Sequence, residues 1–254
     1  MRERVRAASL AASIHLGSGL ILAVLLAILI FVIWFPYPYY EISNGRNLFL
    51  TLILVDMVCG PLLTLLLYSP FKARWKWRLD LAMIIFMQLG AMLYGLEKIS
   101  QSRPVFLAYE GDRFRVVQAA DVDSHLLNGA QSQFSNLSWR GPSLIGTKLL
   151  SSSDPGYLES LRLALEGNPP SFRPERWVDY GTQKEQLLNA LKPMERLMLR
   201  PGVENLVNAL QRSTGLPSSA LGYLPLVQGV RSDWTVVVSR EDGMPKAFWH
   251  VDGW

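Results

Sequence analysis

The 254-residue sequence predicts a membrane protein with an N-terminal bundle of three transmembrane helices, residues 1–99, followed by a periplasmic α+β domain, residues 100–254. Three apolar segments, each about as long as a bilayer-spanning helix, occupy the N-terminal part. Basic residues flank these segments on alternate sides, as they do in proteins whose cytoplasmic loops are positive. After residue 99 the pattern changes to short strand-like and helix-like stretches typical of a folded globular domain.

The first apolar segment predicts a helix from about residue 10 to residue 35. No Asp, Glu, Lys or Arg occurs between Ala7 and Tyr40. A cleaved signal peptide is the alternative, because arginines precede the apolar core. The core is too long for a signal peptide, and it lacks a small-residue cleavage site before the aromatic cluster at residues 34–40. We expect the helix to be retained and this cluster to lie at the membrane–water interface.

Residues 48–68 and 79–98 predict the second and third transmembrane helices. Basic residues precede the first helix and fill the loop between the second and third: Arg2, Arg4, Arg6, Lys72, Arg74, Lys76 and Arg78. Because positive charge marks the cytoplasmic side, we expect a bacterial inner-membrane protein with a cytoplasmic N-terminus and a periplasmic C-terminal domain. The net charge of +4 belongs to the membrane part. It predicts contact with anionic membrane lipid and not with nucleic acid.

Two β-hairpins are predicted at the two ends of the periplasmic domain, because β-branched and aromatic runs flank glycine-containing turns. The expected strands are residues 105–109, 113–117, 234–238 and 247–251. Between the hairpins, leucine and valine spacing predicts three short amphipathic helices. The expected helices are residues 158–165, 187–191 and 203–210. We expect Pro193 to end or kink the middle one.

The sequence has no pattern typical of an enzyme, a cofactor site or a metal site. Cys59 is the only cysteine, so neither an intrachain disulfide nor a cysteine-based metal site can form. His125 and His250 are the histidines of the periplasmic domain, and neither lies in a catalytic motif. Residues 141–148 are similar to the end of a phosphate-binding loop but lack its leading glycine spacing. We therefore expect no catalytic activity, no cofactor and no metal.

The second transmembrane segment carries an ionisable residue near its middle. Asp56 lies about nine residues into this helix, and hence near the bilayer midplane, where a charge is costly. Gln88 is expected at the same depth of the antiparallel third helix, where it can hydrogen-bond to a protonated Asp56. Gly60 gives room beside Pro61, which is expected to bend the helix. Thr64 is expected to compensate by bonding to the Gly60 carbonyl.

These membrane residues are compatible with more than one use. Small residues at helical spacing, such as Ala91 with Gly95, serve packing inside the bundle or reception of a guest helix. A membrane-anchored envelope sensor or regulator with a periplasmic sensing domain is the alternative function, although the cytoplasmic segments are too short for an output domain. An intramembrane enzyme or transporter is a third class, but Asp56 has no second acid at its depth.

A series of short motifs occurs in a fixed order along the chain: Ser13-x-His15-Leu16, Trp34 to Tyr39, Val55-Asp56, Gly60-Pro61-Leu62-Leu63-Thr64, Asp80-Leu81, Gln88-Leu89, Tyr94-Gly95-Leu96, Arg103-Pro104-Val105 and Asp112-Arg113-Phe114. In this order the motifs resemble those of the type IV pilin accessory proteins of the TfpX/TfpZ family. The resemblance covers residues 1–120 well. It extends to the remainder only through the general layout and the final tryptophan.

The resemblance implies an inner-membrane chaperone that binds and stabilises a cognate type IV pilin, the major subunit, before assembly. The pilus assembly platform is a second candidate partner. The membrane residues expected to hold the pilin helix are Asp56, Gly60, Pro61, Thr64, Gln88, Tyr94 and Gly95. The periplasmic residues expected to contact the pilin head are Arg103, Asp112, Arg113 and Phe114. Two modest contacts on one chain would reinforce each other through effective concentration.

Overall fold

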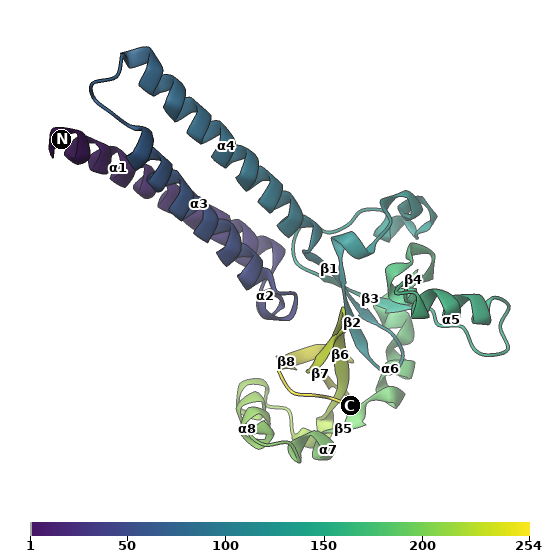
Figure 1. Ribbon diagram of the computed structural model, residues 1–254. Coiled ribbons are helices and arrows are strands. Elements are labelled where there is room, and N and C mark those ends of the chain that lie inside the picture. Colours follow the sequence, from purple (N-terminus) through teal and green to yellow (C-terminus); the bar gives the residue numbers. More distant parts are fainter. Residues whose placement is uncertain (1) are drawn as a thin grey trace. The chain divides into compact units, whose positions relative to one another are not determined.

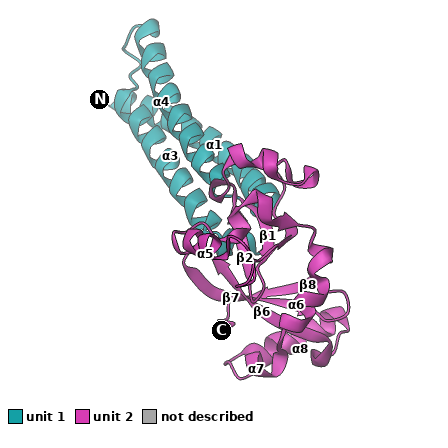
Figure 2. Ribbon diagram, turned by 90° about the vertical axis from the view of Figure 1, so that its right-hand side faces the viewer, with its two compact units in different colours: residues 1–103 teal, residues 104–254 magenta. Residues whose placement is uncertain are grey.

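The computed structural model describes residues 2–254, and the chain divides between Arg103 and Pro104 into two compact units (Figure 2). The N-terminal unit contains three helices that are long and apolar enough to cross a membrane. The C-terminal unit combines a mixed β-sheet with short helices. This arrangement confirms the prediction of three long apolar helices followed by an α+β domain.

The three long helices extend beyond their predicted N-terminal ends. They are α1, Arg2–Ile28, continued as a π-helix over Leu29–Trp34; α3, Gly45–Leu67; and α4, Arg74–Gln101. α1 and α4 therefore begin at arginines that were expected to lie outside the helices. Arginine and lysine are good helix formers. The apolar pattern marks the part of a helix suited to lipid, and it does not mark where the helical backbone starts.

In the N-terminal unit, α1 packs along α3, and α3 packs along α4 (Figure 1). The aromatic segment after α1 contains the short helix α2, Tyr39–Ile42. Trp34, Phe35 and Tyr39 are buried there, whereas Tyr37 is 73% exposed. These three rings are therefore covered by protein and do not meet lipid as the rings of an interfacial belt would, whereas Tyr37 can. Trp34 and Phe35 pack there against neighbouring apolar side chains, including Ile99.

The C-terminal unit is built on one eight-stranded sheet in the order β4-β3-β1-β2-β6-β7-β8, and β5 also pairs with β6. The strands are β1, Pro104–Tyr109; β2, Phe114–Gln118; β3, Ser143–Thr147; β4, Trp177–Val178; β5, Lys192–Pro193; β6, Leu221–Gln228; β7, Arg231–Ser239; and β8, Pro245–Trp249. The antiparallel pairs β1–β2 and β7–β8 confirm both predicted hairpins.

The strands β3, β4, β5 and β6 were not predicted from the sequence pattern, and two of them, β3 and β6, are central to the sheet. β3 occupies residues 143–147 and runs parallel to β1, so the stretch that is similar to a phosphate loop is a strand. β6 is long and nearly central although it contains Pro225, which cannot donate a hydrogen bond to a neighbouring strand. The sheet tolerates this proline because β5 pairs with Gly222 and Tyr223, whereas β2 pairs further along at Leu226 and Val227.

Four short α-helices, together with several 3-10 turns, complete the C-terminal unit. They are α5, Tyr157–Leu165; α6, Lys184–Ala190; α7, Met194–Met198; and α8, Val203–Thr214. The three predicted helices are confirmed, and the middle one ends before Pro193, which lies in β5. α7 and α8 pack on β6–β8 through a cluster that includes Val203, Val207 and Tyr223.

A second apolar cluster lies around Trp177, among β1, β3 and the connecting 3-10 turns. The Trp177 ring centroid is 4.7 Å from that of Phe106 and 6.2 Å from that of Phe134. Its Nε1 donates a hydrogen bond to the Ser171 carbonyl at 2.8 Å. The indole therefore fills the core and fixes the 3-10 turn Pro170–Phe172 at the same time.

Candidate functional site

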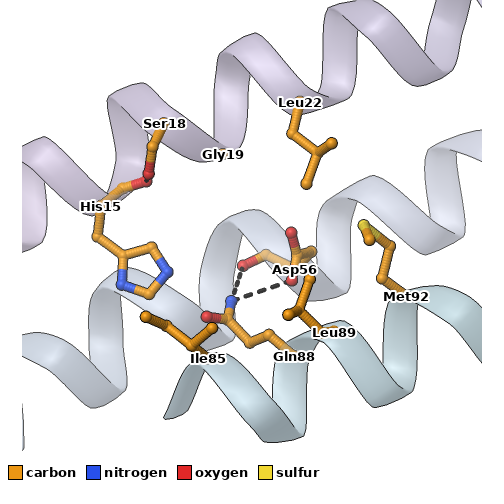
Figure 3. A pocket seen from close by; sticks show the side chains of 9 residues that line it. All are labelled: His15, Ser18, Gly19, Leu22, Asp56, Ile85, Gln88, Leu89 and Met92. Carbon is orange, nitrogen blue, oxygen red and sulfur yellow. Dashed lines mark hydrogen bonds between the residues drawn. The ribbon is translucent and has the colours of Figure 1, made fainter. Parts of the chain in front are cut away.

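The side chains of Asp56 and Gln88 meet between α3 and α4, as their depth in the sequence predicts. Gln88 Nε2 donates to Asp56 Oδ1 at 3.0 Å and lies 3.3 Å from the Asp56 carbonyl oxygen (Figure 3). Both residues are half-buried. Among residues 2–254, neither Asp56 Oδ2 nor Gln88 Oε1 has a hydrogen-bond partner. The pair thus retains hydrogen-bonding capacity in an apolar part of the molecule.

His15 adds a second polar contact to this region, and it connects α1 to α3. Its Nδ1 lies 2.7 Å from the Oγ1 of the buried Thr64. Gly60 lies between the two polar pairs. A Cβ atom at Gly60 would overlap Gln88 Nε2 and come within 2.9 Å of His15 Nε2. Glycine at this position is therefore what allows the three helices to bring these polar groups together.

Two hollows flank the Asp56–Gln88 pair, which lines both of them. The smaller, about 170 Å³, lies between α1 and α4, and His15 and Ser18 contribute polar groups to it (Figure 3). The larger, about 530 Å³, lies between α3 and α4 and is called the α3/α4 groove below. Its lining residues are Leu48, Thr51, Leu52, Val55, Asp56, Cys59, Leu63, Met87, Gln88, Ala91, Met92, Tyr94, Gly95, Lys98 and Ile99.

The α3/α4 groove is apolar apart from the Asp56–Gln88 pair and a polar rim. Gly95 shapes one end of it, because a Cβ atom there would lie 2.5 Å from Leu52 Cδ1. Tyr94 is 64% exposed at the rim, and Lys98 Nζ lies 5.4 Å from the centre of its ring. A groove of this kind suits a second apolar helix that carries a polar group at the matching depth.

The structure separates the predicted membrane residues into two sets. Asp56, Gln88, Tyr94 and Gly95 line the α3/α4 groove. The other three lie elsewhere: Gly60 and Thr64 face His15, and Pro61 is half-buried in a helix that continues through it. The prediction that Thr64 bonds to the Gly60 carbonyl is wrong, because its hydroxyl contacts His15 instead.

His15 was not predicted as a site residue, although one feature of the sequence singles it out. It is the one titratable side chain of residues 7–36, which contain no acidic residue, lysine, arginine, cysteine or tyrosine. A polar side chain in a transmembrane helix commonly faces the bundle interior. This rule would have pointed to His15, but not to Thr64 as its partner.

The four predicted residues around the start of the C-terminal unit do not form one surface. Arg103 is buried and donates through Nη1 to the Ser100 carbonyl at 2.7 Å. Phe114 is fully buried, because alternate residues of β2 face the core, and it therefore offers no surface to a partner. Asp112 and Arg113 form a surface ion pair at 2.7 Å. The Arg113 guanidinium also lies 4.7 Å from the centre of the Trp254 ring.

Comparison with known proteins identifies relatives along nearly the whole chain. The profile of the family described as Fimbrial assembly protein FimB matches residues 3–44. A fimbrial assembly protein of Dichelobacter nodosus, serogroup I, is 31% identical over 242 residues, which cover 94% of this chain and 93% of that protein. Its serogroup E1 counterpart is 29% identical with the same coverage. The protein of serogroups C1 and C2 is 38% identical over 48% of this chain and 92% of that protein. No solved structure shows significant similarity.

Proposed function

The chain belongs to the family of fimbrial assembly proteins, and from this premise we propose that it is an inner-membrane chaperone for a type IV pilin. It binds the cognate major subunit before assembly, in the manner of the TfpX/TfpZ accessory proteins, and delivers it to the assembly platform. The three apolar helices support membrane insertion. The basic residues at the start of α1 and at the start of α4, with Lys72 just before α4, support a cytoplasmic N-terminus and a periplasmic C-terminal unit.

The α3/α4 groove is the observation that carries this proposal. A subunit awaiting assembly must keep an apolar helix in the bilayer, and the groove offers about 530 Å³ of mostly apolar space. Lipid tails can fill such space, but they cannot hydrogen-bond to Asp56 and Gln88. A guest helix can do both, because its apolar side chains fill the groove while a polar group meets the Asp56–Gln88 pair.

Cysteine cross-linking tests the groove directly. Cys59 is exposed, lines the groove and is the only cysteine of the chain. We expect copper-catalysed oxidation in native membranes to join Cys59 to single cysteines placed along the apolar helix of the subunit. The yield is expected to peak at intervals of about 3.6 residues, because only one face of a helix meets the groove.

The matched control moves the thiol out of the groove on a helix that packs against α3. In a Cys59→Ser/Leu20→Cys variant the thiol lies on an exposed position of α1 that lines neither hollow. Cross-linking of the subunit to this position is expected to fall to background. Equal yields from the two positions, or no helical periodicity at Cys59, would refute a guest helix in the groove.

A pair of glycines on α4 gives a second test. Gly95→Leu fills one end of the groove, where a side chain meets Leu52, whereas Gly90→Leu adds the same side chain in open space on the same helix. We expect the Gly95 variant to lower the cellular level of the subunit about three- to tenfold, as steric exclusion of a packed helix requires. The Gly90 variant is expected to leave it unchanged. Immunoblotting of both proteins measures the effect, and equal subunit levels in the two variants would contradict it.

A further inference from the structure

Helix α5 presents its leucines outward instead of toward the core. Leu158, Leu161 and Leu165 are 77%, 45% and 81% exposed, whereas Ser160 is buried. The spacings of three and four residues place these leucines on one side of the helix, called the α5 stripe below. A surface helix normally turns its apolar side toward the core. The α5 stripe is therefore an apolar helix face that the rest of the C-terminal unit leaves largely exposed.

A polar anchor on the opposite side of α5 fixes this orientation. Ser160 Oγ accepts a hydrogen bond from Arg173 Nη2 at 2.6 Å, and Arg173 is 5% exposed. Turning the leucines inward would break this bond and leave a buried guanidinium without it, which is costly. The outward direction of the α5 stripe is thus built into the fold.

The surroundings of the α5 stripe carry more acidic than basic groups. Along one edge, Arg162 is bonded to both Glu159 and Glu166, which leaves one net negative charge. A hollow of about 280 Å³ borders the C-terminal end of α5, and it contains Asp121 and Asp123 together with Arg173. Asp121 Oδ2 accepts from the Gln118 amide at 2.8 Å, and burial raises the pKa of this carboxyl above its ordinary value in spite of that bond and of the nearby Arg115. A further cation in the hollow would favour its charged form.

Charge distinguishes the three surfaces that can cover an apolar stripe. An anionic bilayer surface is repelled by an acidic edge. In a second copy of this chain, antiparallel pairing of two α5 stripes brings Glu159 of one copy beside Glu166 of the other, which is also repulsive. An apolar protein surface with basic residues at its rim is favoured in two ways. Its apolar side chains pack on the leucines of the stripe, and its basic side chains are attracted to the acidic groups around it. The hollow suits such a basic side chain, because Phe172 packs against its aliphatic stem while Asp121 and Asp123 face its charge.

We propose that the α5 stripe and the neighbouring acidic hollow dock an apolar, basic-rimmed surface on the soluble part of the fimbrial subunit. This inference rests on the proposed function and specifies the surface of the C-terminal unit that the subunit contacts. The membrane groove and the α5 stripe then hold two different parts of one client.

Paired serine substitutions in the full-length chain test this proposal. Leu158→Ser/Leu165→Ser removes the two most exposed leucines of the stripe, whereas Leu199→Ser/Val230→Ser changes two apolar residues that are 85% and 103% exposed elsewhere in the same unit. The tagged chain is purified from detergent-solubilised membranes with its subunit. We expect the first variant to recover at least about fivefold less subunit and the second to recover as much as wild type. Asp123→Lys is expected to reduce recovery as well.

The Cys59 cross-link separates failure of this inference from failure of the proposed function. If Cys59 cross-links to the subunit and the α5 variant still recovers as much subunit as wild type, the α5 surface is not the docking site. If wild type gives no cross-link, the groove proposal fails by itself. A wild-type oligomer that dissociates in the α5 variant, with subunit recovery unchanged, would assign the stripe to a second copy. Quenching of a fluorophore at position 165 by lipid-borne quenchers in subunit-free liposomes would assign it to the bilayer. Either result overturns the proposal.

Discussion

Replacement of Glu110 by alanine is expected to destabilise the C-terminal unit by about 3–5 kcal/mol, because it leaves the Arg115 guanidinium, whose side chain is only 14% exposed, without its partner. Glu110 is 7% exposed. Its Oε2 lies 2.9 Å from Arg115 Nε, and its Oε1 accepts from the Ser171 amide and hydroxyl at 3.3 and 3.1 Å. One carboxylate therefore joins the β1–β2 turn to the Pro170–Phe172 turn, and its loss leaves donors from both without an acceptor.

The neighbouring ion pair provides the matched control for Glu110. Asp112 pairs with Arg113 in the same turn, but its side chain is 61% exposed, so Asp112→Ala is expected to cost less than about 1 kcal/mol. Chemical denaturation of the full-length chain in detergent micelles, followed by tryptophan fluorescence, compares the two variants. Glu110→Gln is expected to fall between them, because an amide keeps an acceptor for Ser171 but loses the charge. A cost below 1 kcal/mol for Glu110→Ala would show that water replaces the carboxylate.

The elements that could be predicted from the sequence are those whose residue pattern lies within one short, contiguous segment of the chain. Alternating β-branched and aromatic residues around a glycine-containing turn sufficed for the β1–β2 and β7–β8 hairpins, since both strands and their turn are contiguous. The helical spacing of Val203, Val207 and Leu210 likewise sufficed for α8, whose stripe packs on the sheet. The order of the strands could not be predicted in this way. The parallel pairs β1–β3 and β2–β6 join segments that are far apart in the chain, and Pro225 obscured the pattern of β6.

The part of the candidate site that depends only on the position of a residue along its helix could be predicted from the sequence. Counting residues from the ends of two apolar segments placed Asp56 and Gln88 at one depth, and the structure joins them. The contact between His15 and Thr64 depends also on how α1 is rotated against α3, which hydrophobicity does not define. The α5 stripe was unpredictable for a related reason. A leucine stripe marks one side of a helix, but the Ser160–Arg173 bond decides which way that side faces.

Replacement of Asp56 by leucine is expected to lower the cellular level of the fimbrial subunit about three- to fifteenfold. Hydrogen bonds between helices in a membrane contribute about 0.6–1.7 kcal/mol each, and tenfold in occupancy corresponds to about 1.4 kcal/mol. An unoccupied subunit is expected to be degraded, so its abundance reports its occupancy. Asp56→Asn is expected to retain most of the function, because the amide still accepts from Gln88. Immunoblotting of this protein and the subunit in the same cells measures both effects.

A double substitution decides whether the Asp56–Gln88 pair serves the guest helix or only the packing of α3 against α4. If the pair has only a structural role, Asp56→Leu/Gln88→Leu removes both polar groups at once, leaves neither unsatisfied, and restores the subunit level that Asp56→Leu alone had lowered. If the pair bonds to the guest, the double variant remains as defective as the single one, because the guest's polar group then meets only hydrocarbon. We expect the second outcome, with the abundance of the variant protein itself unchanged. Recovery of the subunit in the double variant would confine Asp56 and Gln88 to a structural role.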